Sequence, residues 1–204
     1  MGQEFRVYTR VAQSTADASS PDLRSPIARS TTLFHAGKAY DYLDSSGEIT
    51  VFEPNQERFW LVSPARRERT SVSFADLENR LHQASARAEK FLKEVSAGGH
   101  PDAKDIAALV ETQLRPKLSE AMSADGKTLR LESSVMSYQA TLAPSPDTAL
   151  ITAYTRYVDW TARLNFVLNP RSNPPAPRLR LNAALVQHSA FPLTVRLELH
   201  QKPA

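Results

Sequence analysis

The chain has 204 residues, 41% of them apolar and 23% charged, which is ordinary for a globular protein able to bury a substantial core. It contains no cysteine, which excludes disulfides, cysteine nucleophiles and cysteine-ligated metals. The net charge of +3 is too small to demand a nucleic-acid partner, and we expect none. No apolar run approaches the ~20 residues of a membrane span, so we expect no transmembrane segment.

Residues 4–12 alternate between apolar and polar side chains, which predicts a half-buried first strand. The chain opens with Met1-Gly2 and enters this strand almost at once. Domains can begin in this way, but the pattern is also typical of a chain whose signal segment was removed before Gln3. The second interpretation predicts a periplasmic or secreted location. A polar connection follows over residues 13–26.

Residues 27–74 read as an antiparallel meander of short strands. Runs of β-branched and aromatic residues are separated by two to four residues rich in Gly, Pro, Asn and Ser. These connections are too short for parallel crossovers, so neighbouring strands must be antiparallel. The run from Phe59 to Val62 is apolar at every position, which predicts a strand covered on both faces.

At Phe74 the apolar period changes to three and four residues, which predicts a helix of about 20 residues. Ser73 is its expected N-cap, and Gly98-Gly99 is its expected end. A second helix is predicted to begin at Pro101 or Asp102, with an apolar face that continues to Met122. Pro116 falls inside this second pattern, so we expect a kink or break near residues 114–115.

The rest of the chain alternates again between strand and helix patterns. Asp125-Gly126 predicts a turn before two strands that form a hairpin. Asp147, or Ser145 with Pro146 in the first helical position, is expected to cap a third helix that stops at Asn169-Pro170. The remaining expectations are a short helix over 178–187, a break at 191–192, and a last strand over 193–199.

Strands and helices are segregated along the chain, which predicts an α+β fold. We expect one domain over residues 1–204. It should contain a large curved antiparallel sheet of about eight or nine strands, with the meander as its core, covered on one face by three to four helices.

No motif in the chain signals catalysis or metal binding. The five histidines lack the spacing of metal ligands, and no serine lies in a Gly-x-Ser-x-Gly elbow. We therefore expect no enzyme activity, no metal and no cofactor. A hydrolase with a dispersed site stays open, and it would require a histidine and a carboxylate to converge on a serine in space.

Two groups of side chains are candidate binding residues. The aromatic residues of the meander are either an ordinary core or the lining of an apolar ligand cavity. The charged run at residues 66–69 is either an edge-strand device that prevents aggregation or a contact for an anionic group such as a lipid headgroup. The candidates are Phe34, Tyr40, Tyr42, Phe52, Phe59 and Trp60 for the apolar ligand, and Arg66, Arg67 and Arg69 for the anionic group.

The segment LFHAGKAYDYLDSSGEITVFEPNQERFWLV, residues 33–62, resembles the bacterial lipoprotein-carrier (LolA/LolB-like) superfamily. The resemblance rests on the strand that follows Gly37-Lys38 and on the turn at Pro54. It implies a cell-envelope location and an apolar cargo, but it assigns no cargo-contacting residue. The chain departs from the carriers because it begins with a strand where they begin with a helix, and the helix over 154–168 has no counterpart. It is also similar to exported bacterial proteins of unassigned function.

These patterns predict a non-enzymatic exported protein that binds a hydrophobic ligand, such as a lipid or a lipoprotein acyl chain, between sheet and helices. The expected partner is a lipid or a lipidated protein. The alternative is a structural or protein-interaction module of the cell envelope without a small-molecule ligand.

Overall fold

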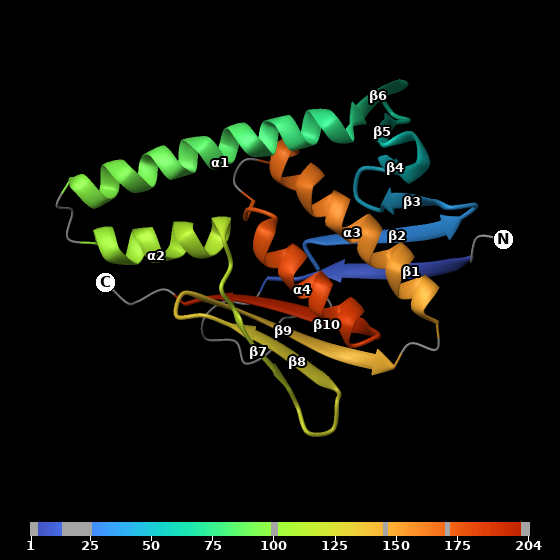
Figure 1. Ribbon diagram of the computed structural model, residues 1–204. Coiled ribbons are helices and arrows are strands. Elements are labelled where there is room, and N and C mark those ends of the chain that lie inside the picture. The colour runs from blue at the N-terminus through green and yellow to red at the C-terminus, as the bar shows by residue number, and fades with distance from the viewer. Residues whose placement is uncertain (1–3, 14–25, 99–101, 145–146, 170–171, 201–204) are drawn as a thin grey trace. The chain divides into compact units, whose positions relative to one another are not determined.

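The computed structural model describes residues 4–13, 26–98, 102–144, 147–169 and 172–200, and it has the predicted α+β architecture with antiparallel sheets (Figure 1). The contacts divide the chain into two compact units, residues 1–76 and 77–204. We call them the N-terminal unit and the C-terminal unit and describe each by itself. The single domain over residues 1–204 stays a prediction.

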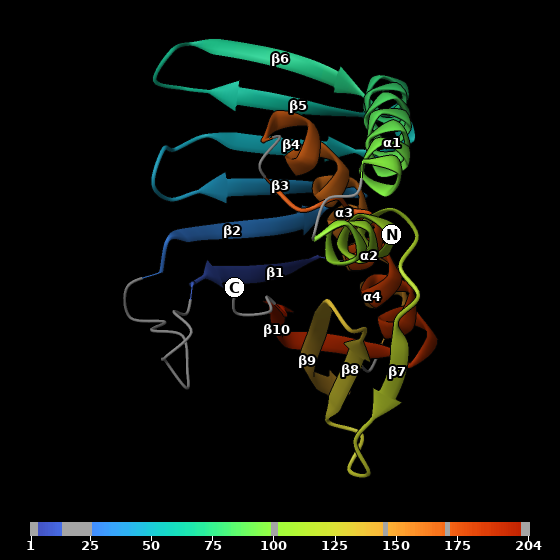
Figure 2. The same ribbon diagram turned by 90° about the vertical axis from the view of Figure 1, so that its left-hand side faces the viewer.

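The N-terminal unit is a six-stranded antiparallel sheet whose strands follow one another in sequence order (Figure 2). The predicted meander is thereby confirmed. Ala36 and Gly37, between the second and third strands, both have positive φ (50° and 75°), as a two-residue hairpin turn requires. The strands are β1 Phe5–Val11, β2 Ala28–His35, β3 Lys38–Leu43, β4 Ile49–Glu53, β5 Arg58–Ser63 and β6 Glu68–Ser73, with a 3-10 turn at Pro54–Gln56.

One face of this sheet carries the core of the N-terminal unit, and we call it the phenylalanine face. Phe5 stacks on Phe34 with ring centroids 4.1 Å apart, and Phe74 packs against both Phe52 and Phe59 at 5.7 Å. Apart from one glutamate, every buried strand residue of the unit lies on this face. The strand register places on it Phe5, Val7, Thr9, Val11, Ala28, Ser30, Thr32, Phe34, Ala39, Asp41, Leu43, Thr50, Phe52, Phe59, Leu61, Ser63, Glu68, Thr70 and Val72.

The C-terminal unit combines a four-stranded antiparallel sheet with four helices. The sheet order is β10-β9-β8-β7, so the last strand of the chain pairs beside β9. The first turn of α1 belongs to the N-terminal unit, because the division falls between Asp76 and Leu77. The elements are α1 Phe74–Ala97, α2 Ala103–Leu114, β7 Ser119–Met122, β8 Thr128–Glu132, β9 Met136–Pro144, α3 Thr148–Leu168, α4 Ala176–Gln187 and β10 Ala190–Leu199.

The core of the C-terminal unit lies between this sheet and α4. Leu181 and Leu185 of α4 are fully buried in one cluster with Leu129, Leu131 and Met136 of the strands. Helix α3 lies beside α4, and its Tyr154 ring packs on Phe191 at 4.7 Å. Side chains therefore fill the space between α4 and the sheet.

The predicted single sheet of eight or nine strands is wrong, because the ten strands form separate sheets of six and four. Alternation along a strand reports which residues share a face, but it does not report which strand lies at either edge. The strands after Ala97 pair only with one another, in the order β10-β9-β8-β7. The sequence pattern does not reveal at which strand one sheet ends and the next begins.

Two element boundaries also differ from expectation. The second helix ends at Leu114, as Pro116 predicts, but the apolar face expected to reach Met122 is a strand there, paired with β8. The break expected at residues 191–192 is instead a register shift inside β10, where Pro192 has no amide to donate.

The helix starts agree with the predicted caps. Ser73 Oγ accepts a hydrogen bond from the Asp76 amide at 3.0 Å, and Asp147 accepts one from the Ala149 amide at 2.7 Å. No helix in the described ranges combines the length and apolar character that a membrane span requires.

Candidate functional site

The second face of the six-stranded sheet carries all of the lysines and arginines of its strands, and we call it the basic face. The phenylalanine face holds two strand carboxylates and no cation. The positively charged side chains of the strands therefore lie on the face opposite the phenylalanine face. Within the six strands, the charged residues of the basic face are Arg6, Arg10, Arg29, Lys38, Arg58 and Arg69, with Glu53 as the one carboxylate.

A continuous apolar strip crosses the middle of the basic face. The register aligns Leu33, Tyr40, Val51 and Trp60 in one row across four neighbouring strands. A second row beside it holds Tyr42, Ile49 and Val62, and Thr31 of β2 separates these three from Tyr8 of β1 in the same row. None of these eight aromatic and aliphatic side chains is buried, and Tyr8 and Tyr42 are 71% and 42% exposed.

An open antiparallel sheet face is ordinarily polar where it meets water. A contiguous row of half-exposed aromatic and aliphatic side chains marks an interaction surface more often than a solvated one. Of the apolar run from Phe59 to Val62, only Phe59 is buried, so the expectation of a strand covered on both faces holds for that residue alone.

Glu53 anchors the polar part of the basic face. Its carboxylate accepts hydrogen bonds from Lys38 Nζ at 2.5 Å, Arg58 Nε at 2.8 Å and Trp60 Nε1 at 3.1 Å. The Lys38 and Arg58 hydrogen bonds, in that order, hold the pKa of Glu53 at about 2, against 4.5 for a free side chain. The glutamate is therefore ionised at neutral pH, and it fixes the plane of the indole.

Two guanidinium groups lie against the Trp60 ring. The guanidinium carbon of Arg58 is 4.9 Å from the ring centroid, and that of Arg69 is 5.0 Å from it. Both distances are within the range of a cation–π interaction. Arg58 also pairs with Glu53, whereas Arg69 has no carboxylate within ion-pair distance in the described part of the chain.

The structure divides the six aromatic residues that the sequence singled out. Three of them, Phe34, Phe52 and Phe59, are buried on the phenylalanine face. The other three, Tyr40, Tyr42 and Trp60, lie on the basic face. Because side chains on the two faces of a strand point in opposite directions, the six do not line one surface.

The three arginines of the charged run also separate. Arg66 and Arg67 lie in the turn between β5 and β6, where Arg66 pairs with Glu48 and Glu68 at 3.2 and 3.4 Å. Arg69 lies inside β6, on the basic face. Of this group, Arg69 is the one that joins the aromatic candidates.

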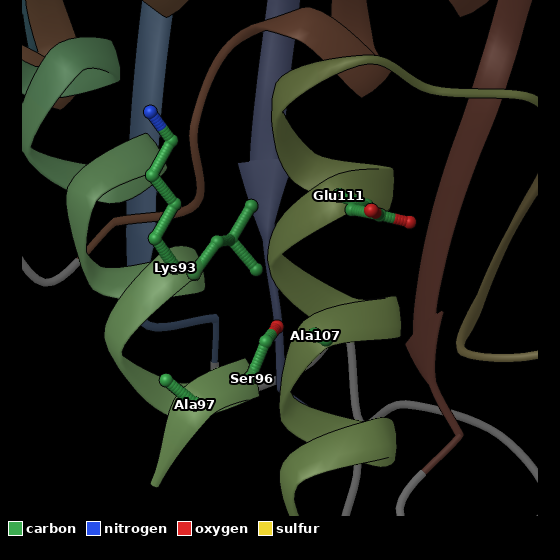
Figure 3. Close-up of a pocket in the computed structure, with 6 residues that line it drawn as sticks. Lys93, Ser96, Ala97, Ala107 and Glu111 are labelled. Carbon is green, nitrogen blue, oxygen red and sulfur yellow. The ribbon is translucent and has the colours of Figure 1, made fainter.

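A hollow of about 510 Å³ lies between α1 and α2 (Figure 3). Ser96 points across it toward Ala107, whereas Lys93 and Glu111 point away from each other. Arg115, directly after α2, forms an ion pair with Glu89 of α1. The volume is that of a ligand pocket, but the hollow is an open seam between helices, with no convergent polar groups at its base.

The dispersed hydrolase would require a histidine, a serine and a carboxylate to converge. His200 Nε2 lies 3.2 Å from Ser137 Oγ, the closest approach of that kind among the described residues. Ser137 is buried within an extended strand, and no carboxylate pairs with His200 in the described chain. His188 instead pairs with Glu120 at 2.7 Å, alongside Arg180 at 2.8 Å. His100 lies outside the described residues.

A partly buried chain of polar side chains joins α3 to α4. Arg178 Nε donates to Asn182 Oδ1 at 3.1 Å, and Asn182 Nδ2 donates to Asp159 Oδ1 at 2.7 Å. Burial raises the pKa of Asp159. The members of this chain satisfy one another, which suits a structural role in fixing the helix pair. No group of three or more potential metal ligands is present among the described residues.

The basic face was not recognised in the sequence because its members are dispersed. Arg6, Arg10, Lys38 and Arg58 each look like an isolated surface charge in the chain. A search for charge at alternate positions of successive strands would have found them, once the hairpin registers were assigned.

No family model, no curated protein and no solved structure matches this chain.

Proposed function

We propose that the protein is a non-enzymatic binding module that uses the basic face of its six-stranded sheet to bind an anionic lipid surface. The observation that carries the proposal is the apolar strip with cations at both sheet edges. Arg6 and Arg10 lie on the edge strand β1, and Arg69 lies on the opposite edge strand β6. Apart from Tyr8 of β1, the strip occupies the strands between them.

This arrangement suits the boundary between lipid headgroups and acyl chains. Tryptophan and tyrosine favour that region because each has an apolar ring and a polar tip. Each arginine or lysine near an anionic lipid surface contributes about 1 kcal/mol of attraction. Six strands at ~4.8 Å spacing give a contact surface roughly 24 Å wide, which is the scale of several headgroups.

The chemistry of the strip favours lipid over single-stranded nucleic acid. A nucleobase stacks on an open aromatic face, but Arg58 and Arg69 already lie over the ring of Trp60. The cross-strand neighbours of Trp60 are Val51 and Ser71, and Val62 follows it on the same face of β5. The partner that we propose is therefore a lipid, one of the two partners expected from the sequence, and an exported location would fit such a partner. An acyl chain enclosed between sheet and helices stays a prediction.

The proposal is tested by co-sedimentation with vesicles of phosphatidylcholine alone and of phosphatidylcholine mixed with phosphatidylglycerol. We expect binding to the mixed vesicles that weakens as salt is added, because screening reduces the attraction. The double variant Arg6→Glu and Arg10→Glu removes two attractive contacts on an exposed strand. The loss of about 1 kcal/mol of attraction at each position weakens binding roughly 30-fold, and repulsion of the two added carboxylates should weaken it further.

The matched control is the double variant Lys90→Glu and Lys93→Glu, which makes the same change in net charge on the exposed side of α1. It should bind within about twofold of the unaltered protein if the basic face makes the contact. If both double variants lost the same affinity for the mixed vesicles, net charge alone would drive binding. Absence of binding to the mixed vesicles would refute the proposed function.

A further inference from the structure

In the cluster of Arg58, Trp60 and Arg69, two guanidinium groups lie against one indole ring. A general attraction to negative charge would not require the two groups to be held in this way. Each guanidinium carbon lies within about 5 Å of the same ring centroid, so the two are at most twice that distance apart. The register puts Arg58 two residues before Trp60 on β5, and Arg69 opposite Val62, on the other side of the indole. The ring therefore holds both guanidinium groups in place.

Glu53 makes the cluster rigid without neutralising it. Its carboxylate accepts hydrogen bonds from Arg58 Nε, Trp60 Nε1 and Lys38 Nζ. The bond through Nε leaves the two terminal nitrogens of Arg58 to other partners. Arg69 keeps its full set of donors, because no carboxylate pairs with it among the described residues.

We propose that Arg58, Trp60 and Arg69 form a subsite for a phosphate group, in which Arg69 is the principal ligand and Arg58 the second. A guanidinium presents parallel N–H donors that match two oxygens of a phosphate, whereas an ammonium acts as a point charge. The one lysine of the basic face is already bound to Glu53, so the cations left to a ligand are guanidinium groups. A carboxylate has two oxygens, which one guanidinium can occupy, whereas a phosphate group has further oxygens for a second guanidinium. The pair therefore favours phosphate over carboxylate by geometry as well as by charge.

This inference rests on the proposed function for its biological source of phosphate, which is the headgroup of a lipid. The key variant is Arg69→Lys, which keeps the charge but loses the paired donors. The matched control is Arg67→Lys, in the exposed turn before β6. Arg58→Lys is the second variant, and circular dichroism establishes that each variant folds.

The first arm compares vesicles that contain phosphatidic acid with vesicles that contain oleate, adjusted to the same surface potential. We expect the unaltered protein to prefer the phosphate vesicles. Arg69→Lys should weaken binding to them roughly tenfold, the value of one charge-assisted hydrogen bond, and should remove the preference. Equal binding to both vesicle types, unchanged in Arg69→Lys, would overturn the subsite and leave the proposed function standing.

The second arm uses inorganic phosphate and needs no vesicle. The chain has two tryptophans, Trp60 and Trp160, so two indole N–H signals are expected by nuclear magnetic resonance, and Trp160→Phe assigns them. Phosphate should shift the Trp60 signal more than chloride does at equal ionic strength, and Arg69→Lys should abolish the difference. If vesicles do not bind but this shift occurs, the subsite stands for free phosphate and the proposed function fails.

The same titration separates other sources of phosphate. If phosphate vesicles fail to bind and a single-stranded oligonucleotide shifts the Trp60 signal at lower concentration than inorganic phosphate does, nucleic acid replaces lipid as the partner. If neither phosphate nor phosphate vesicles perturb Trp60 in the unaltered protein, the subsite is refuted.

Discussion

Replacing Glu53 by Gln should destabilise the N-terminal unit in a pH-dependent way. The carboxylate has a pKa of about 2 in the folded chain and 4.5 as a free side chain. At 1.36 kcal/mol for each pKa unit, this difference sets an upper limit of about 3 kcal/mol on its contribution to stability. The side chains of Lys38 and Arg58 are both more than a third exposed, so solvent screening reduces the expected contribution to about 1–2 kcal/mol.

The direction of the pH dependence follows from the lowered pKa. The folded chain binds the proton more weakly than the unfolded chain, so the contribution is complete above about pH 4.5. It is lost progressively as the pH falls toward about 2, where the folded carboxyl itself takes up a proton. Glu53→Gln should therefore lower the free energy of unfolding at pH 7, and the gap between the two proteins should close in acid.

The assay is urea unfolding at several pH values, followed by the fluorescence of Trp60 in a Trp160→Phe background. The control is Glu57→Gln, which removes the same charge from an exposed residue that has no ion pair in the described part of the chain. Two results would refute this role of Glu53. One is a loss of unfolding free energy at pH 7 that is as large in Glu57→Gln as in Glu53→Gln. The other is a difference in unfolding free energy between Glu53→Gln and the unaltered protein that is as large at pH 2 as at pH 7.

Two further predictions concern the C-terminal unit. Leu185→Ala should lower the free energy of unfolding by about 2–5 kcal/mol, because Leu185 is fully buried between α4 and the sheet. Val186→Ala, on the same helix but 41% exposed, should cost much less, and similar urea midpoints for the two variants would contradict this core. Asp147→Ala should cost about 1 kcal/mol by removing the cap of α3. Thermal unfolding measures that loss, and an unchanged midpoint would show that the cap does not contribute.

Local chemistry predicted the elements of this fold more reliably than their assembly. The cap at Ser73 and the break before Pro116 are determined by a few neighbouring residues, and both are confirmed. The meander is predictable for the same reason, since short connections allow only antiparallel neighbours. The division into two sheets depends on which strands share an edge, and no local pattern carries that information.

The candidate site shows the same limit. Trp60 and Arg69 were both singled out in the sequence, and the structure brings them into contact. Arg6 and Arg10 were passed over, because an arginine on an alternating strand looks like ordinary solvated charge. Their significance arises when six strands align in register and every strand contributes to the same face. The strands that form the basic face extend over 68 residues, from Arg6 to Ser73. Their cations gather on one surface only in the folded sheet, so no short window of sequence shows them together.

The most direct test of the basic face is to ask whether Trp60 touches lipid. The Trp160→Phe protein, in which Trp60 is the one remaining tryptophan, is mixed with anionic vesicles whose acyl chains carry bromine, a contact quencher of tryptophan fluorescence. We predict strong quenching on phosphatidylglycerol vesicles, little on phosphatidylcholine vesicles, and recovery of fluorescence at high salt. Binding to the anionic vesicles without quenching of Trp60 would show that another surface makes the contact and would contradict the account.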